Sequence, residues 1–175
     1  SSMQRISTDL SEKKYAIIIN GGGSAPKDNF IRYWNNCSLM YKTLIEKNYS
    51  RENIFVLSSD GTSTNVDTNT GADPYDGGSL FSQDLDLDCD GTNDIGYAAT
   101  KSDVSTVFDL IKDKLEEDYK PNIFIYVTDH GYLPTDGSSS ADVRLWLWDG
   151  LMSPEGFFKE LRKLNKANFI QIVMD

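Results

Sequence analysis

Four stretches of the chain are largely apolar, and each has the length of a β-strand. They are residues 15–20, 53–58, 123–127 and 168–174. Strands that are apolar at nearly every position, rather than at every second one, are typical of parallel sheets covered on both faces. The hydrophobic pattern therefore predicts a buried, mostly parallel sheet.

Helical spacing separates these strands. Apolar residues recur at steps of three and four in residues 30–44, 104–115 and 157–164, which predicts three amphipathic helices. Ser153 followed by Pro154 has the form of a helix start, with the serine as the cap. Residues 144–149 alternate in type and predict a small hairpin. The order of elements predicts an α/β fold with helices flanking a mostly parallel sheet.

A long irregular segment interrupts this order at about residues 60–100. It is rich in Gly, Ser, Thr, Asn and Asp, and it has too few apolar residues to build a core of its own. We therefore interpret residues 62–98 as an insertion in a single domain, residues 14–175, preceded by an N-terminal extension, residues 1–13. A chain of 175 residues has the length of one domain.

The composition of the chain limits the classes of partner that the protein is expected to bind. The formal net charge is −10, which disfavours general binding to nucleic acid or to anionic membrane surfaces and favours cations. No apolar run approaches the ~20 residues needed for a membrane span. The N-terminus has no signal-peptide pattern. Cys37 and Cys89 are too few for a disulfide framework, and the sequence leaves open whether they pair.

His130 is the only histidine, and it follows the predicted strand 123–127 directly. Ligands of open parallel sheets bind beyond the carboxyl ends of the strands, and imidazole is the side chain that titrates nearest neutrality. His130 is thus a candidate general base, although a histidine that caps a turn is the alternative. Neither cysteine suits as its nucleophile, since Cys37 lies on an apolar helix face and Cys89 between two aspartates.

The insertion contains an acidic pattern that resembles the first part of an EF-hand calcium loop. The candidate ligands are Asp86, Asp88, Asp90, Thr92 through its carbonyl, and Asp94. Gly91 stands where such loops turn sharply, but position 12 is Tyr97 instead of an acid, so Asp84 or Asp76 would have to complete the shell. The spacing predicts a structural Ca²⁺ site of weak affinity, which suits an extracellular or cell-surface setting. A solvated acidic loop is the alternative.

The order of the motifs resembles the caspase-like cysteine peptidases, in particular the legumain-like group. An apolar strand runs into "TDHG" (128–131), a hairpin and a helix follow, and a second apolar strand reads "NFIQIVMD" (168–175). The strand "YAIIINGG" (15–22), its helix and the strand before "SSDG" (58–61) agree as well. This resemblance covers most of residues 14–175 outside the insertion, and it implies a three-layer caspase-like fold and a cysteine endopeptidase.

The resemblance also implies roles for residues. His130 matches the catalytic base, and Gly131 matches the glycine whose N–H helps to form the oxyanion hole. The family's nucleophilic Cys would follow just after Asp175. The chain would then be the N-terminal part of a catalytic domain, inactive alone, which acts with its remaining C-terminal part on a peptide or protein substrate.

Two further residues are matched less directly. Arg32 falls near a family arginine that lines the primary specificity pocket, and Asn29 lies one position from an asparagine that orients the histidine. Trp146 and Trp148 either line a cleft near His130 or pack within the hairpin. A calcium-stabilised binding module of the same fold, without catalysis, remains the alternative function. Gly21–Gly23 lacks the rest of a phosphate-binding motif, so a nucleotide site is disfavoured.

Overall fold

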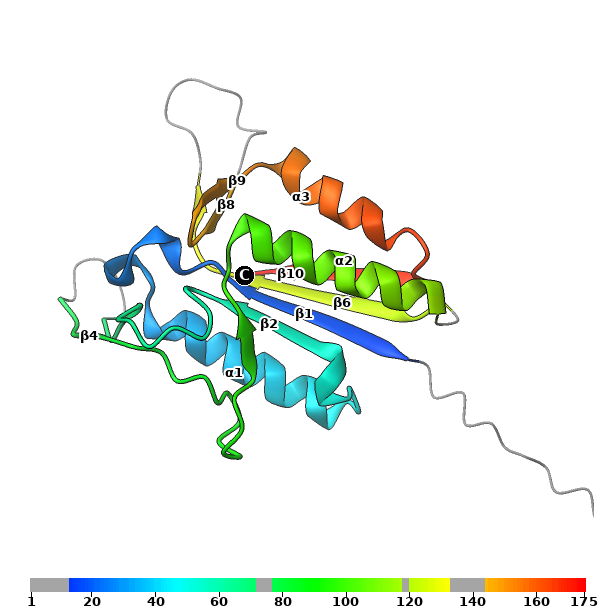
Figure 1. Ribbon diagram of the computed structural model, residues 1–175. Coiled ribbons are helices and arrows are strands. Elements are labelled where there is room, and N and C mark those ends of the chain that lie inside the picture. Colours follow the sequence, from blue (N-terminus) through cyan, green and yellow to red (C-terminus); the bar gives the residue numbers. More distant parts are fainter. Residues whose placement is uncertain (1–12, 72–76, 118–119, 133–143) are drawn as a thin grey trace, which may run out of the picture.

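The computed structural model describes residues 13–71, 77–117, 120–132 and 144–175, so the expected N-terminal extension lies almost wholly outside the described residues. A central sheet of five parallel strands forms the middle layer (Figure 1). In spatial order these strands are β10 (Phe169–Met174), β6 (Asn122–Thr128), β1 (Lys14–Asn20), β2 (Ile54–Ser58) and β5 (Ile95–Tyr97). The predicted α/β fold with a parallel sheet is confirmed.

Helices cover both faces of this sheet. Helix α1 (Ile31–Glu46) lies on one face, and α2 (Lys101–Glu117) and α3 (Pro154–Leu161) lie on the other (Figure 1). Helix α3 begins as predicted, because the Ser153 hydroxyl accepts a hydrogen bond from the Gly156 N–H at 3.1 Å. Short 3₁₀ turns complete the helical elements: η1 (Gly22–Ser24), η2 (Pro26–Asp28), η3 (Arg51–Asn53) and η4 (Arg162–Leu164).

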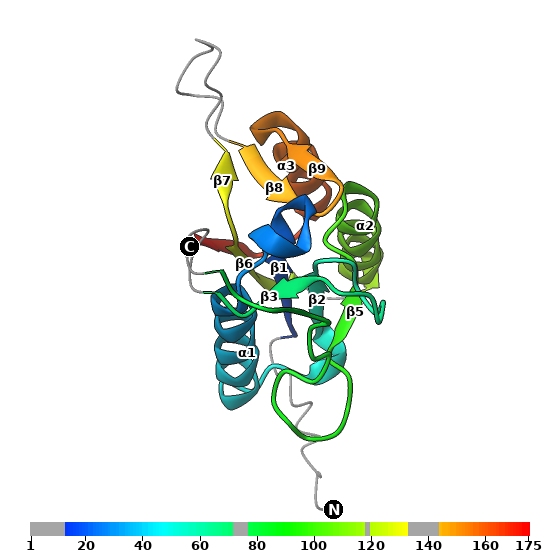
Figure 2. The same cartoon turned by 90° about the vertical axis from the view of Figure 1, so that its left-hand side faces the viewer.

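Two small antiparallel sheets lie outside the central one. The pair β3 (Thr68–Asn69) and β4 (Leu80–Phe81) belongs to the insertion. Strands β7 (Gly131–Tyr132), β8 (Arg144–Leu147) and β9 (Gly150–Met152) form the other sheet, which contains the predicted hairpin. Figure 2 shows this sheet beside the turns that follow β1, above the carboxyl ends of the central strands.

The insertion contributes more to the domain than its sequence predicted. Its last strand, β5, pairs in parallel with β2 and becomes an edge of the central sheet. Ile95 is only 2% exposed, and Leu87, also in the insertion, is fully buried beneath α1. Three residues, Ile-Gly-Tyr, are too short a run for the hydrophobic pattern to reveal, so this strand was not predicted from the sequence.

The core is divided by the sheet. Ile17 and Ile125 pack with Phe108 of α2 on one face, whereas Ile18 packs with Cys37 of α1 on the other. All of these side chains are at most 1% exposed. Alternate residues of β1 thus enter opposite core layers, which explains why that strand is apolar at successive positions.

Strand β10 differs from the other strands, because it is an edge with exposed apolar side chains. Phe169 is 59% exposed and Met174 is 56% exposed. Phe158 of α3, 53% exposed, stands beside the same edge, where Leu161, Ile170 and Ile172 line a shallow groove with it. None of the helices among the described residues combines the length and hydrophobicity of a membrane span.

Two isoleucines of this sheet differ in burial, which predicts that replacing each by alanine lowers the free energy of unfolding by a different amount. Ile125→Ala in the central strand β6 is expected to lower the free energy of unfolding by about 2–5 kcal/mol, because it leaves a cavity in a closed core. Ile172→Ala on the edge strand, where the side chain is 38% exposed, is the matched control and should cost about 1 kcal/mol or less. Urea unfolding of both variants measures this; equal losses would contradict the described burial.

Candidate active site

The parallel register brings the ends of three strands together. Asn20 of β1 pairs with Thr128 of β6, and Met174 of β10 pairs with Val127. The Asp175 N–H continues the ladder by donating to the Val127 carbonyl at 3.0 Å. The residues that follow these strands therefore meet at one edge of the sheet, which is where ligands of such folds bind.

The His130 imidazole is held at this edge by the turn that follows β1. Its Nε2 lies 3.0 Å from the Asp28 carbonyl oxygen. A carbonyl can only accept, so Nε2 carries a proton and the neutral ring has its free lone pair on Nδ1. The Tyr33 hydroxyl lies 3.3 Å from Nδ1 and 3.4 Å from Nε2, and with Nε2 protonated it can donate only to Nδ1. The contacts thus select the tautomer in which Nδ1 is the base.

Aromatic rings surround the imidazole. Its centroid lies 5.3 Å from that of Tyr33, 5.7 Å from that of Phe30 and 6.1 Å from that of Trp146. Trp146 therefore lines the site, as one of the two readings of the hairpin tryptophans predicted. Trp148 lies instead against Gly22, where an added Cβ would come within 2.9 Å of its ring.

Two cavities share the histidine. One, of about 260 Å³, lies toward the hairpin and is lined by Arg144, Trp146 and Met174. The other, of about 360 Å³, lies toward α1 and is lined by Arg32, Tyr33 and Asn36. Both are also lined by a common set of residues: Thr128, Asp129, His130, Gly131 and Asp175. His130 thus stands between two spaces that can take parts of an extended ligand.

Asp129 is a second ionisable group of the site. Its backbone is in the positive-φ region, at 142°, and its carboxylate accepts a hydrogen bond from the His130 N–H. Burial raises the pKa of this carboxyl to about 6, although the His130 N–H, the charge of His130 and the Gly22 and Gly23 amides favour the ionised form. Asp129 is thus held under strain where it fixes the backbone of the catalytic candidate.

Gly21 allows the strands and the hairpin to meet. A Cβ at this position would lie 1.8 Å from the Trp146 carbonyl oxygen and 2.8 Å from the Asp129 carboxylate. Only glycine permits these approaches, so any side chain here would push the hairpin or Asp129 away from the site. Gly21, the first glycine after β1, thus has a packing role.

Gly131 has its N–H directed away from β8. Gly131 and Leu145 are opposite each other, and the flanking bond runs from the Trp146 N–H to the His130 carbonyl at 3.3 Å. This pattern makes Gly131 and Leu145 a non-hydrogen-bonded pair. The Gly131 N–H is therefore not used by the β7–β8 ladder, next to the histidine that an oxyanion donor should accompany.

Arg32 and Asn29 have different places. Arg32 is exposed in the larger cavity; its guanidinium donates to the Tyr33 hydroxyl at 2.8 Å and lies 4.8 Å from that ring's centroid. Asn29 is 1% exposed, and its amide donates to the Ser59 hydroxyl at 2.7 Å and to the Asp67 carbonyl at 2.8 Å. The residue that contacts the His130 ring is the neighbouring Asp28, through its carbonyl, so the family asparagine one position from Asn29 has no counterpart in the Asn29 side chain.

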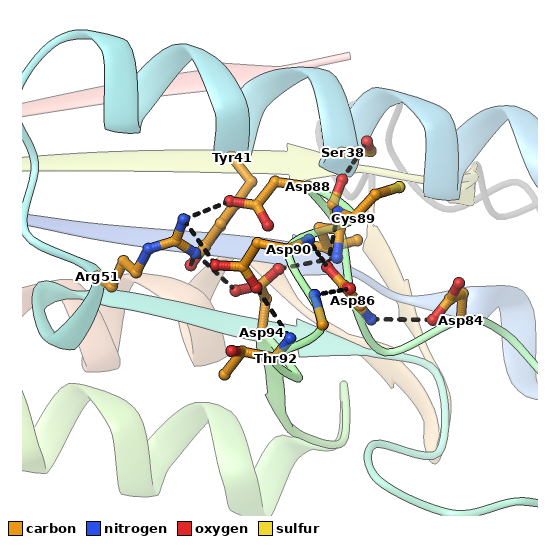
Figure 3. A network of polar contacts seen from close by, with 12 residues as sticks. Ser38, Tyr41, Arg51, Asp84, Asp86, Asp88, Cys89, Asp90, Thr92 and Asp94 are labelled. Carbon is orange, nitrogen blue, oxygen red and sulfur yellow. Dashed lines mark hydrogen bonds and ion pairs between the residues drawn. The ribbon is translucent and has the colours of Figure 1, made fainter.

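The acidic loop forms a compact cluster (Figure 3). Oxygens of Asp86, Asp88 and Asp94 lie within 4.8 Å of one another. Asp86 accepts the N–H groups of Cys89 and Gly91, each at 2.7 Å, and these bonds lower its pKa, that of Gly91 most. The loop therefore folds around the first carboxylate of the predicted pattern.

Arg51 of η3 points into this cluster (Figure 3). Its guanidinium lies 2.7 Å from Asp88, 3.0 Å from Asp90 and 3.6 Å from Asp94. No sequence pattern predicts this cation at the cluster, because Arg51 is distant from the loop in the chain. Part of the negative charge that the calcium prediction relied on is thus already compensated within the protein.

The remaining predicted residues lie at the margins of the cluster. The Thr92 N–H donates to the Asp90 carboxylate at 2.8 Å, and Asp84 accepts from the Asp86 N–H at 3.1 Å, so Asp84 caps the start of the loop. Asp76 lies outside the described residues. Cys37 is buried and Cys89 is exposed, and neither forms a disulfide.

Tyr33, Asp28 and Asp129 contribute to the site without having been predicted. Asp28 acts through its carbonyl, which every residue has, so no pattern could reveal it. Tyr33 is apparent only as an aromatic residue beside Arg32, and Asp129 as an acid that precedes the histidine.

No protein-family model matches the chain, and no curated protein matches it either. A functional assignment therefore rests on the residues of this site.

The raised pKa of Asp129 predicts a pH-dependent cost to stability. The folded-state pKa, about 6, lies above the unfolded value of about 3.9, so the folded protein binds the proton more tightly. The stabilisation of the folded state by this tighter proton binding is fully present below about pH 4 and is lost as the pH rises through about 6. Relative to Asp129→Asn, the wild type should therefore lose thermal stability between these pH values.

Thermal unfolding of both proteins across this range, followed by circular dichroism, measures the difference in melting temperature. Asp113→Asn, at an exposed position of α2, is the control and should give a constant difference. A constant difference for Asp129→Asn as well would contradict the burial of an ionised Asp129.

Proposed function

We propose that this chain is the histidine-bearing part of a caspase-like, legumain-related cysteine endopeptidase. The observation that carries the proposal is the His130 imidazole, fixed by the Asp28 carbonyl so that Nδ1 is the base, at the edge where β6 and β10 both end. Cavities on either side of the ring suit a peptide or protein substrate that passes across the histidine.

In this mechanism the nucleophile is a Cys just after Asp175. Because β10 runs parallel to β6 and its ladder extends to Asp175, the next residue would begin beside the Asp129–His130 turn. The thiol proton moves to Nδ1, and sulfur attacks the scissile carbonyl carbon. The Gly131 N–H stabilises the oxyanion. The imidazolium then protonates the leaving amine, and water hydrolyses the thioester, which regenerates the thiol.

Arg32 has the charge and position of a specificity determinant in this proposal. It lies exposed in the cavity on the α1 side of His130, and the adjoining ring of Tyr33 limits its motion. Asp175 lines the same cavity, so opposite charges face a bound side chain there. This arrangement favours a polar or charged residue at the primary subsite and does not choose among them.

The remaining C-terminal part of the catalytic domain is the proposed partner of β10. Parallel sheets are normally covered on both faces, yet Phe169 and Met174 are exposed at this edge, with Phe158 of α3 beside them. Pairing with a further strand would give hydrogen-bond partners to the backbone groups at this edge, and packing against it would remove these side chains from water. Such packing would also complete the site, since the edge adjoins Asp175.

We further propose that the acidic loop binds calcium as a structural cofactor. Three aspartates with oxygens within 4.8 Å of one another supply hard ligands, and Asp88 Oδ1 is buried without a hydrogen-bond partner among the described residues. Arg51 would have to give up its contact with Asp94 or Asp88 when the ion binds. The resulting weak affinity suits the proposed extracellular or cell-surface setting.

A calcium-stabilised binding module without catalysis is the alternative function. It would use the same cavities and the same exposed edge, but it would not need a Cys next to Asp175. Peptide hydrolysis by the full-length protein therefore distinguishes the two functions, and the role of His130 provides the sharpest form of this test.

His130→Ala in the full-length protein is expected to lower kcat/KM for peptide hydrolysis by at least about 100-fold, because general acid–base catalysis is lost. Lys159→Ala, at an exposed position of α3, is the control and should retain activity. Unchanged melting temperatures would exclude unfolding as the cause. Full activity of the His130 variant would refute the peptidase assignment.

Calcium binding is tested by calorimetry. The wild type should release or absorb heat on titration with calcium, and an Asp86→Asn/Asp88→Asn variant should lose the component that arises from the loop, because two carboxylate ligands become amides. Asp113→Asn should titrate as the wild type does. Indistinguishable titrations of the wild type and the double variant would remove the calcium proposal.

A further inference from the structure

A second group of buried polar residues lies between the carboxyl ends of β1 and β2 and the β3–β4 pair. Its members are each at most 5% exposed: Asn20, Asn29, Ser58, Ser59, Asp67, Thr68 and Gln83. Hydrogen bonds join most of them; for example, the Ser58 hydroxyl donates to Gln83 Oε1 at 2.6 Å. Asp67 is the only carboxylate in this set, and it is fully buried.

One oxygen of Asp67 is satisfied and the other is not. Oδ1 accepts hydrogen bonds from the Thr68 hydroxyl at 3.0 Å and from the Gln83 N–H at 2.7 Å. Oδ2 has no hydrogen-bond partner among the described residues. Asp60 lies against Asp67, close enough for a hydrogen bond between the two side chains when one of them holds a proton. Its Oδ1 is likewise buried and receives no hydrogen bond from another group in the described part of the chain. The two carboxylates thus share a site in which each has a buried oxygen that needs a proton or a cation.

Like charges so placed need compensation. No ion pair joins either of them to a lysine or arginine in the described residues. A buried carboxylate oxygen without a hydrogen bond or a counter-charge is unfavourable, so a proton or a cation must be present.

We propose that Asp60 and Asp67 bind a hard divalent cation, calcium or magnesium, through their two unpartnered oxygens, with water completing the shell. Oxygen ligands alone select this class of metal, and magnesium in particular is often held by one or two carboxylates plus water. Asp60 is only partly buried, which gives such waters a place. This site is separate from the Asp86–Asp94 loop and does not depend on the proposed peptidase activity.

A cation here would also stiffen the wall of the cleft. Asn29 donates to the Asp67 carbonyl at 2.8 Å, and the preceding residue, Asp28, contacts His130 Nε2 through its carbonyl. Metal binding to the Asp67 carboxylate would therefore limit motion of the turn that selects the histidine tautomer. Asp60 and Asp67 are positioning residues in this account, since neither touches the imidazole.

The test separates this site from the loop by using the Asp86→Asn/Asp88→Asn chain as background. Thermal unfolding is measured in chelator, and then with calcium alone and with magnesium alone. At roughly 100 times the dissociation constant, one of these ions should raise the melting temperature by about 5–10 °C. Adding Asp67→Asn to the background should abolish this shift, whereas adding Asp113→Asn should leave it unchanged.

Asp60→Asn provides a second variant if Asp67→Asn does not fold, and it should abolish the shift as well. Native mass spectrometry of the background protein should detect one bound ion, which is lost in either variant. If neither ion changes the melting temperature of the background protein, the proposal is overturned. That result would indicate a proton shared by the two carboxyls. A shift that persists in Asp67→Asn and in Asp60→Asn would overturn it equally.

Discussion

The parallel pairing of β1 with β6 is the constraint on which the rest of the molecule depends. Seven residue pairs, from Lys14 with Asn122 to Asn20 with Thr128, set the two strands in register. Because the strands end level with each other, the turn that follows β1 and the His130 turn that follows β6 must meet. The contact between the Asp28 carbonyl and the imidazole, the close approach of Gly21 to Trp146 and the two cavities beside the ring all follow from that register.

Buried carboxylates are the second theme of the structure. Asp129 supports the backbone of His130, Asp67 lies beneath the wall of the cleft, and the aspartates of the loop gather around Arg51. Each is compensated in a different way, by backbone N–H groups, by a neighbouring cation or by an ion that we propose. Of these groups Asp67 is the most deeply buried; a carboxylate so placed costs stability, and its hydrogen bonds make the polar framework beside the candidate site more rigid.

The sequence predicted the elements of the sheet well, because each of the four long strands carries enough apolar residues to be recognised alone. Strand β5 was missed since three residues contain no periodicity, and only its pairing with β2 makes it a strand. His130 was found because an imidazole after a buried strand is rare. The groups that hold it could not be found, since a backbone carbonyl carries no sequence signal and Asn29, which lies one position from the family's orienting asparagine, is turned toward Ser59. The position of Arg51 in the acidic cluster was not predicted, because the spacing of residues along the sequence does not show which of them come close together in the fold.

The central claim is that the Asp28 carbonyl holds His130 as a base through Nδ1. Because His130 is the only histidine, ¹⁵N–¹H correlation spectra of uniformly ¹⁵N-labelled chain contain a single imidazole and report its tautomer directly. We predict that the neutral ring is protonated at Nε2, with Nδ1 unprotonated. A ring protonated at Nδ1, or an even mixture of tautomers, would contradict the account.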